Sequence, residues 1–167
     1  MFSGKTEELL RRLQREQYRP GGKAQAFKPS MDIRYSDLAI VTHQGDEFPC
    51  QLVDRSTHML HLVDKDTTMV GIDEGQFYDA DEPKLLYQTC IALAKTGRDV
   101  WVACLSQDYR GEPFENVSYV LGVANKIIEK YAVCSGCGSD EASYSYRVQN
   151  DSDERLVLGE KGVYDAR

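Results

Sequence analysis

The first six residues constrain the fold of this chain more than any other segment. Residues 3–6, Ser-Gly-Lys-Thr, match the second half of the phosphate-binding pattern G-x-x-x-x-G-K-[ST]. In that pattern backbone N–H groups surround the phosphates of a nucleotide, the lysine reaches the β- and γ-phosphates, and the threonine binds Mg²⁺. The tetrapeptide alone is a moderate signal, because such short sequences also occur by chance in turns and at helix starts. The first glycine of the pattern would precede Met1, so we expect further residues upstream.

The segment after this motif predicts a helix. Residues 7–16 consist mainly of strong helix formers, and Leu9, Leu10 and Leu13 recur at the spacing of one helix face. The helix therefore begins where the loop ends, and its N-terminal dipole faces the phosphate site. The alternative is a solvated amphipathic helix whose Gly-Lys-Thr start is incidental.

Composition limits the class of protein. A length of 167 residues with 41% hydrophobic content suits one domain with its own core and a small appendage. No apolar run approaches the ~18 residues of a membrane span, and the charged start does not resemble a signal peptide. A net charge of −7 argues against nucleic acid as the main partner, because basic surfaces bind phosphate backbones. The five cysteines, mostly scattered, fit the reducing cytoplasm.

Predicted strands and helices alternate along most of the chain. We expect strands at residues 23–29, 38–41, 67–73 and 99–105, weaker elements at 48–52 and 59–63, and helices at 82–96 and about 118–130. The polar stretch 30–37 is predicted to be a surface loop or lid. The runs at 67–73 and 99–105 are apolar enough for strands that are buried on both faces. This order predicts an α/β fold with right-handed crossovers and a mostly parallel sheet that has helices on both faces.

A second informative site follows the strand predicted at 67–73. In P-loop enzymes an acidic residue at the end of a buried strand beside the loop holds Mg²⁺, usually through water, and Asp73 is placed for this role. Adjacent strand residues point to opposite sides, so Glu74 would face the group that receives the phosphate. This makes Glu74 a candidate general base for a hydroxyl nucleophile. The pair alone would favour a solvated turn, but the Gly-Lys-Thr loop earlier in the chain favours the functional interpretation.

Six short motifs occur in a defined order. They are Gly4-Lys5-Thr6, Asp32-Ile33-Arg34-Tyr35-Ser36, Asp73-Glu74-Gly75-Gln76-Phe77, Gly111-Glu112-Pro113-Phe114, Cys134-Ser135-Gly136-Cys137 and Gly162-Val163-Tyr164. In order and approximate spacing, over nearly the whole chain, they resemble the thymidine kinases of the zinc-carrying type. D-E-G-Q-F followed by C-x-x-C is highly specific, whereas G-x-Y is weak by itself. Relative to the family, the N-terminal strand and the C-terminal pair of metal ligands are missing.

The resemblance implies a site for ATP and Mg²⁺. Lys5 and Thr6 would serve the phosphates and the metal, with Asp73 supporting the metal. Arg34 resembles the family's basic residue that approaches the transferring phosphate, whose charge a guanidinium can stabilise. Glu74 would accept the proton of the deoxyribose 5′-hydroxyl as the catalytic base. The implied ATP and Mg²⁺ residues are Met1, Phe2, Ser3, Gly4, Lys5, Thr6, Asp32, Arg34, Asp73 and Gln76.

The resemblance also implies a nucleoside slot, which should be flat and apolar with a few polar groups at its edge. The family positions that line this slot correspond to Phe77, Leu105, Tyr109 and Phe114. Met1 would close it. Side chains of these types more often belong to a hydrophobic core than to a binding site. Only their match to family positions therefore favours the slot.

A segment near the end resembles the start of the family's lasso, which binds the base largely through backbone groups. It comprises Arg155, Leu156, Val157, Leu158 and Gly159, and Tyr164 would pack against the sugar. The stretch 145–163 is polar and has few apolar residues, so we expect its order to depend on bound thymidine and on the zinc-binding turn at its base. Two positions depart from the family, which commonly has Asp in place of Ser106 and paired glycines in place of Gly159-Glu160.

Cys134 and Cys137 form a C-x-x-C pair with glycines that permit a tight turn. Two thiolates are half of a structural Zn²⁺ site, which almost always has four ligands. The resemblance places the other pair just after the tyrosine matched by Tyr164, so we expect two further ligands beyond Arg167. A redox pair is the alternative.

These observations predict two domains and one reaction. The P-loop kinase core would span residues 1–132, and a small zinc-ribbon-like lasso domain residues 133–167. The predicted reaction is ATP-dependent phosphorylation of thymidine to its monophosphate. The alternatives are another P-loop phosphotransferase or ATPase, and a non-catalytic zinc-ribbon binding module. The resemblance also implies a cytoplasmic homotetramer that thymidine triphosphate inhibits by feedback.

Overall fold

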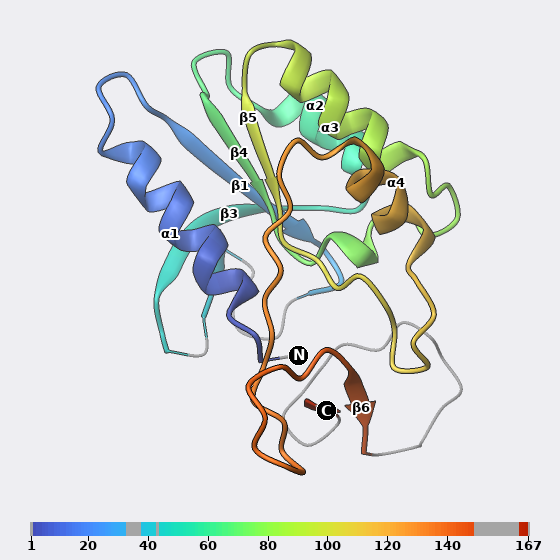
Figure 1. Cartoon of the computed structure of the whole chain (residues 1–167). Coiled ribbons are helices and arrows are strands. Elements are labelled where there is room, and N and C mark those ends of the chain that lie inside the picture. The colour runs from blue at the N-terminus through green and yellow to red at the C-terminus, as the bar shows by residue number, and fades with distance from the viewer. Residues whose placement is uncertain (1, 33–37, 43, 149–163, 167) are drawn as a thin grey trace.

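A five-stranded sheet lies at the centre of the computed structural model (Figure 1), which describes residues 2–32, 38–42, 44–148 and 164–166. Its strands are β1 (Ala24–Pro29), β2 (Ala39–Val41), β3 (Glu47–Val53), β4 (Met69–Ile72) and β5 (Asp99–Val102). The spatial order is β2-β3-β1-β4-β5. The pairs β3–β1, β1–β4 and β4–β5 are parallel, and β2 pairs antiparallel with β3. The predicted mostly parallel sheet is therefore confirmed.

Helices cover both faces of this sheet. They are α1 (Lys5–Gln17), α2 (Met59–Leu62), α3 (Leu85–Lys95) and α4 (Glu115–Val123), with 3₁₀ turns η1 (Ser56–His58) and η2 (Gly75–Phe77). Helix α1 lies on one face, and α2, α3 and α4 lie on the other (Figure 1). One buried apolar cluster joins α1 to the sheet, and a second joins the other three helices to it. Within the described residues, no helix is long and apolar enough to cross a membrane.

The helix predicted directly after the Gly-Lys-Thr motif is confirmed as α1. Leu9, Leu10 and Leu13 lie on its buried face and pack against the sheet. Beside this face, the carboxylate of Glu8 forms ion pairs of 2.7 Å with Arg11 and 2.6 Å with Arg12. Burial of the leucine face holds α1 across the sheet, with its first turn at the carboxyl end of β4.

The two strands predicted to be fully buried differ in the structure. All four residues of β4 are buried, as its apolar composition predicts. In contrast, Asp99 of β5 is exposed and the other three residues are only half-buried, so the prediction of a buried strand is wrong here. The reason is position, because among the described residues β5 is the last strand of the sheet and pairs with β4 alone.

The helix predicted at 118–130 is displaced. In the structure α4 begins at Glu115 and ends at Val123, and Ala124 already has an extended backbone with φ −67° and ψ 131°. Residues 122–131 are exposed. A helix in a protein owes most of its stability to the burial of an apolar face, and the side chains of this segment stay exposed. Its chain instead runs toward the small sheet at the carboxyl end of the strands (Figure 1).

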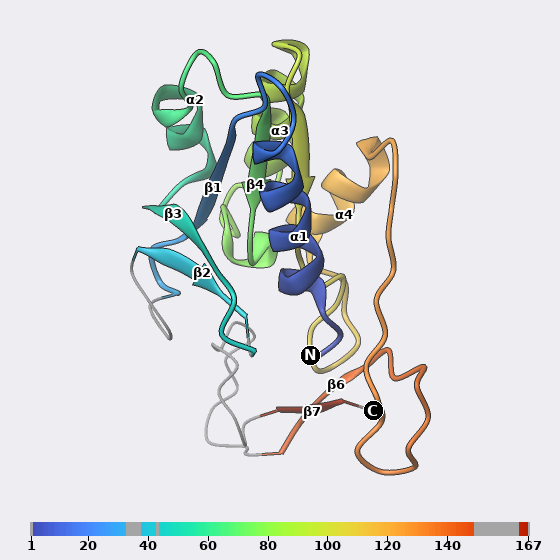
Figure 2. The same ribbon diagram turned by 90° about the vertical axis from the view of Figure 1, so that its left-hand side faces the viewer.

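A second, two-stranded sheet lies in the region predicted to form the lasso domain. It pairs β6 (Ser145–Arg147) antiparallel with β7 (Tyr164–Ala166). A small cluster of Ala132, Ala142 and Ala166, with Cys134 against it, forms its core. Figure 2 shows β6 and β7 at the end of the molecule where α1 begins. The small sheet therefore lies at the same end of the central sheet as the Gly-Lys-Thr loop.

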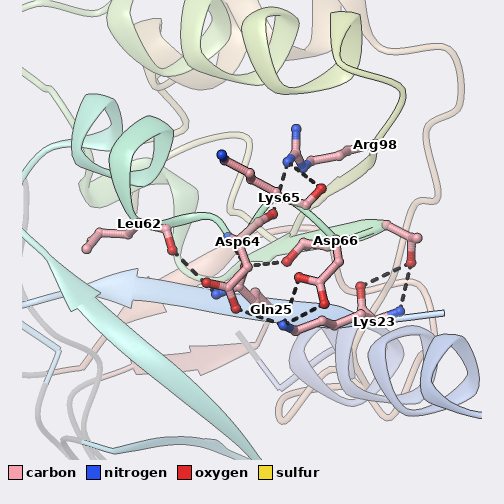
Figure 3. A network of polar contacts seen from close by, with 9 residues as sticks. Lys23, Gln25, Leu62, Asp64, Lys65, Asp66 and Arg98 are labelled. Atoms are coloured by element: carbon pink, nitrogen blue, oxygen red, sulfur yellow. Dashed lines mark hydrogen bonds and ion pairs between the residues drawn. The ribbon is translucent and has the colours of Figure 1, made fainter. Parts of the chain in front are cut away.

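Polar contacts tie together the opposite end of the central sheet (Figure 3). The Lys23 ammonium forms ion pairs of 2.9 Å with both Asp64 and Asp66. The side-chain oxygen of Gln25 accepts a hydrogen bond of 2.7 Å from the Asp64 N–H, and Arg98 donates one of 3.0 Å to the Asp64 carbonyl. The segment before β4 is thereby joined to the starts of β1 and β5. Because these groups are largely exposed, the network contributes more to strand alignment than to overall stability.

Candidate active site

The structure brings the Gly-Lys-Thr loop and the acidic pair after β4 together. Gly4 precedes α1 in the left-handed region, with φ 75°, which glycine adopts without strain. Lys5 and Thr6 therefore lie in the first turn of α1. The Thr6 hydroxyl lies 3.4 Å from a carboxylate oxygen of Asp73. The two motifs thus lie side by side in the structure.

Asp73 lies in a buried and acidic environment. Burial, together with the nearby charges of Glu74 and Asp32, raises the pKa of its carboxyl to about 7, although a backbone hydrogen bond from Glu74 and the Lys5 ammonium act in the opposite direction. Asp32 is buried as well. A carboxyl in such surroundings keeps its proton unless a cation is nearby. The site therefore favours a positive ion beside Asp73.

The Thr6 hydroxyl and the Asp73 carboxylate fit what Mg²⁺ requires. Among the described residues, no group of three or more His, Cys, Asp or Glu side chains could hold a metal ion. Mg²⁺ does not need such a cage, because it retains several waters and binds through one or two protein oxygens together with the phosphates of its nucleotide. An adjacent hydroxyl and carboxylate match that pattern.

Glu74 turns away from β4 through a strained backbone. Its φ of 50° and ψ of 45° place it in the left-handed region, directly before η2. A non-glycine residue there costs on the order of 1–3 kcal/mol and is typical of functional sites. The separation of Glu74 from Asp73 was predicted from strand alternation, but it results from this turn.

Gln76 connects Glu74 to the loop after β5. Its side-chain N–H donates to the Glu74 carboxylate, and its side-chain oxygen accepts a hydrogen bond of 3.0 Å from the Leu105 N–H. Gln76 is 1% exposed, whereas its partners Glu74 and Leu105 are half-buried. The ATP or Mg²⁺ role that the resemblance implies for Gln76 stays a prediction, and in this structure its side chain supports the carboxylate of Glu74.

Asn116 of α4 holds the same turn and was not predicted from the sequence. Its side-chain N–H₂ group donates to the carbonyls of Gly75 (3.1 Å), Gln76 (3.3 Å) and Tyr78 (2.6 Å). The turn also requires glycine at position 75, because a Cβ there would lie 2.7 Å from a methyl carbon of Val102. No sequence signal marks Asn116, since its partners lie about forty residues earlier in the chain.

The predicted nucleoside-slot residues come from two neighbouring segments. Phe77 ends η2, while Leu105, Tyr109 and Phe114 lie on the loop between β5 and α4. Phe114 is buried and the other three are half-buried. The bond from Leu105 to Gln76, the neighbour of Phe77, joins the two segments.

Tyr164, predicted to pack against the sugar, is joined to Tyr109 through Arg147. The Arg147 guanidinium lies 3.8 Å from the centre of the Tyr109 ring and donates a hydrogen bond of 2.6 Å to the Tyr164 hydroxyl. Arg147 was not predicted either, because nothing in its local sequence distinguishes it from an exposed strand arginine. Several predicted site residues lie outside the described residues: Met1, Arg34, Arg155, Leu156, Val157, Leu158 and Gly159.

The predicted metal pair lies beside the small sheet. The Gly138 N–H donates to the Cys134 carbonyl at 2.9 Å, and the Ser135 N–H donates to the Ala166 carbonyl at 3.0 Å, so a tight turn carries the pair and is attached to β7. Cys134 is half-buried and Cys137 is exposed. In the described part of the chain, no third side chain joins them to complete a metal site. A zinc site that uses these two thiols as half of its ligands therefore stays a prediction.

Known proteins are similar to this chain over its full length. The sequence model of the thymidine kinase family matches residues 1–167. A thymidine kinase of Rhodothermus sp. (strain ITI 518) is 40% identical over 167 residues, which cover 100% of this chain and 75% of that relative. A thymidine kinase of Bacteroides thetaiotaomicron is 37% identical over 99% of this chain and 79% of its own length. One of Bdellovibrio bacteriovorus is 36% identical over 100% of this chain and 78% of its own length. The chain therefore belongs to the thymidine kinase family.

Proposed function

We propose that this chain transfers the γ-phosphoryl group of ATP to the 5′-hydroxyl of thymidine, giving thymidine monophosphate for nucleotide salvage. Its membership of the thymidine kinase family supports this reaction. The observation that carries the proposal is the contact between Thr6 and Asp73 beside Glu74. It joins a phosphate-binding loop, a metal-supporting carboxylate and a candidate base in one site.

On the donor side, the first turn of α1 binds the phosphates. Backbone N–H groups of the loop and the positive end of the helix attract them, and the Lys5 ammonium reaches the β- and γ-phosphates. Thr6 and Asp73 would hold Mg²⁺, which when bound neutralises charge on the β- and γ-phosphate oxygens. Phosphoryl transfer needs little covalent help from the protein, so these residues act mainly by position and charge.

On the acceptor side, Glu74 accepts the proton of the 5′-hydroxyl as its oxygen attacks in line. The hydrogen bond from Gln76 orients the carboxylate, and the contacts of Asn116 hold the backbone of the turn. A base held in this way contributes typically about 10²–10⁴-fold to the rate. Aromatic residues from two segments, Phe77 and Tyr109, line the nucleoside slot, and backbone groups of 155–159 would contact the base.

The finer features that the family resemblance implies are part of the same proposal. Cys134 and Cys137 supply two ligands of a structural zinc ion, which stiffens the turn attached to β7. Arg34 stabilises charge on the transferring group. The enzyme acts as a cytoplasmic homotetramer, and thymidine triphosphate inhibits it as the end product of the pathway. Sedimentation of the purified chain, and titration of its activity with thymidine triphosphate, test these two features.

An assay with radiolabelled nucleosides, ATP and Mg²⁺ tests the reaction. Label should appear in thymidine monophosphate, and Lys5→Met should abolish the product, because the loop would lose its phosphate-binding charge. Deoxyuridine measured in parallel gives the preference between the two pyrimidine nucleosides. Release of phosphate from ATP without any nucleoside product would instead assign the chain to the ATPases.

A further inference from the structure

Arg147 connects the loop after β5 to the small sheet. Its guanidinium carbon lies 3.8 Å from the centre of the Tyr109 ring and 5.3 Å from that of Tyr164. Its Nη2 and Nε donate hydrogen bonds of 2.6 Å and 3.2 Å to the Tyr164 hydroxyl. Arg147 and Tyr164 are also direct partners across the β6–β7 pair, so the backbone and the side chain reinforce the same contact.

The contact is buried and uses properties that only arginine combines. Arg147 is 8% exposed and Tyr164 6%. A guanidinium is planar, so it can stack its face on one ring while its edge donates to another group. The Tyr164 oxygen accepts two N–H bonds from this edge, and its own hydrogen must therefore point elsewhere. An ammonium group could carry the same charge, but it could not stack and donate in one plane.

Tyr109 and Tyr164 belong to separate parts of the fold. Tyr109 lies on the β5–α4 loop, which also contributes Leu105 and Phe114 to the proposed slot, whereas Tyr164 begins β7. A second contact, of 3.2 Å from the Gln107 side chain to the Ser143 carbonyl, joins the same loop to the segment before β6. The relative position of the two aromatic rings thus depends on how the small sheet docks on this loop.

We infer that Arg147 is a positioning residue for the nucleoside. It holds the Tyr109 ring and the Tyr164 hydroxyl at a fixed separation, and thereby sets the width of the slot between the β5–α4 loop and the small sheet. This inference rests on the proposed function for the identity of the ligand. Gln76 and Asn116 hold the turn that carries Glu74, so loss of Arg147 should leave the base in place.

The test measures steady-state kinetics of the full chain with substitutions at Arg147. Arg147→Gln should raise the KM for thymidine by about 10–100-fold, while kcat and the KM for ATP stay within about threefold. Arg147→Lys should resemble Arg147→Gln, because it restores charge without the stack. Rescue by lysine, or an unchanged KM for thymidine, would overturn the inference.

Arg110 provides a matched control at the same ring. It is exposed, its guanidinium carbon lies 5.2 Å from the Tyr109 ring centre, and its Nε donates to the Tyr109 hydroxyl at 2.9 Å. Arg110→Gln removes one positive charge near the slot but leaves the bridge to Tyr164, so the KM for thymidine should stay within about twofold of the original. An increase in the KM for thymidine as large as that caused by Arg147→Gln would mean that only positive charge near the slot matters, and would overturn the inference.

Tyr164→Phe keeps the test decisive if the Arg147 variants fail to fold. It removes only the hydroxyl, and it should raise the KM for thymidine in the same direction. The double variant with Arg147→Gln should be no worse than the more impaired single variant, because both changes break one contact. If the effects of the two changes on the KM for thymidine were fully additive, Arg147 and Tyr164 would act independently and the inference would be refuted. An original chain inactive toward thymidine would refute the proposed function and this inference with it, whereas an active chain with unaffected Arg147 and Tyr164 variants would refute the inference alone.

Discussion

The Thr6 hydroxyl and the Asp73 carboxylate lie 3.4 Å apart although 67 residues separate them in the chain. Packing of α1 on β4 establishes this distance. Gly71 lies in the middle of β4, and a Cβ there would come within 2.9 Å of two methyl carbons of Leu13. The missing side chain lets α1 approach the strand closely, and the first turn of the helix is thereby brought to the end of β4.

Replacement of Gly71 should disturb the site from a distance. Gly71→Ala places a methyl group against the fully buried Leu13, and such overpacking typically costs about 1–3 kcal/mol. We therefore expect a lower melting temperature and a higher KM for ATP, measured by calorimetry and steady-state kinetics. Gly122→Ala is the control, since an added Cβ on α4 meets open space and should be neutral or slightly stabilising. Equal effects of the two changes would contradict this account of α1.

Glu74→Gln should remove the base and preserve binding. The amide has nearly the same shape but cannot accept the hydroxyl proton, so kcat should fall by roughly 10²–10⁴-fold while the affinity for thymidine changes little. Rapid-quench kinetics and equilibrium titration with thymidine measure the two quantities separately. Turnover at the original rate would exclude Glu74 from proton transfer.

The stability of the ligand-free chain should depend on the protonation of Asp73. Burial raises the pKa of this carboxyl to about 7 in the folded chain, against about 3.9 for an exposed aspartate. The folded state therefore holds its proton more tightly than the unfolded state between these two values. The stabilisation is complete below about pH 4 and is lost as the pH rises through about 7.

Urea unfolding across this pH range measures the effect. The free energy of unfolding of the original chain should decrease from pH 4 to pH 8 relative to that of Asp73→Asn, which cannot titrate at this position. Mg²⁺ competes with the proton, so the affinity for Mg²⁺ and ATP should rise over the same range. A constant difference between the two chains would mean that Asp73 is already ionised at low pH.

Asn116→Ala should loosen the catalytic turn. The change leaves three buried carbonyls without their side-chain donor, and an unsatisfied buried polar group costs about 1–3 kcal/mol. Because the left-handed conformation of Glu74 is strained, we expect kcat to fall more than the KM values change. Ser118→Ala is the matched control, because on the same helix it removes only a hydroxyl bonded to the Phe114 carbonyl. If both variants lose the same activity, Asn116 has no special role at the turn.

Cys137→Ser should reduce the zinc content. Elemental analysis of the original protein should find about one zinc ion per chain, and the substitution should abolish tight binding because a hydroxyl is a poor zinc ligand. Cys90→Ser is the control and should leave the zinc content unchanged. Cys90 is buried on α3, and burial raises the pKa of its thiol to about 12. Protein that is free of metal yet folded and active would return the pair to a redox role.

Local patterns in the sequence were sufficient for the elements that depend on neighbouring residues. The leucines of α1 predicted the helix and its buried face, and the apolar run before Asp73 predicted β4. The alternation of strands and helices predicted the mostly parallel sheet. Asp73 and the Gly-Lys-Thr loop could be assigned to one site because P-loop enzymes have an acidic residue at the end of a buried strand beside the loop. Each of these inferences depends on periodicity or order, which are properties of the linear chain.

Tertiary packing alone decided the rest. Strand β5 lies at the edge of the sheet in the described part of the chain, and α4 ends at Val123, because burial depends on which surfaces meet. Glu74 is aimed by a left-handed turn that Asn116 holds from about forty residues away, and Arg147 joins two aromatic residues of separate segments. The sequence around Asn116 and Arg147 contains no pattern that predicts these contacts. A single polar side chain acquires its role from the groups that the fold places beside it, and no local pattern encodes those neighbours.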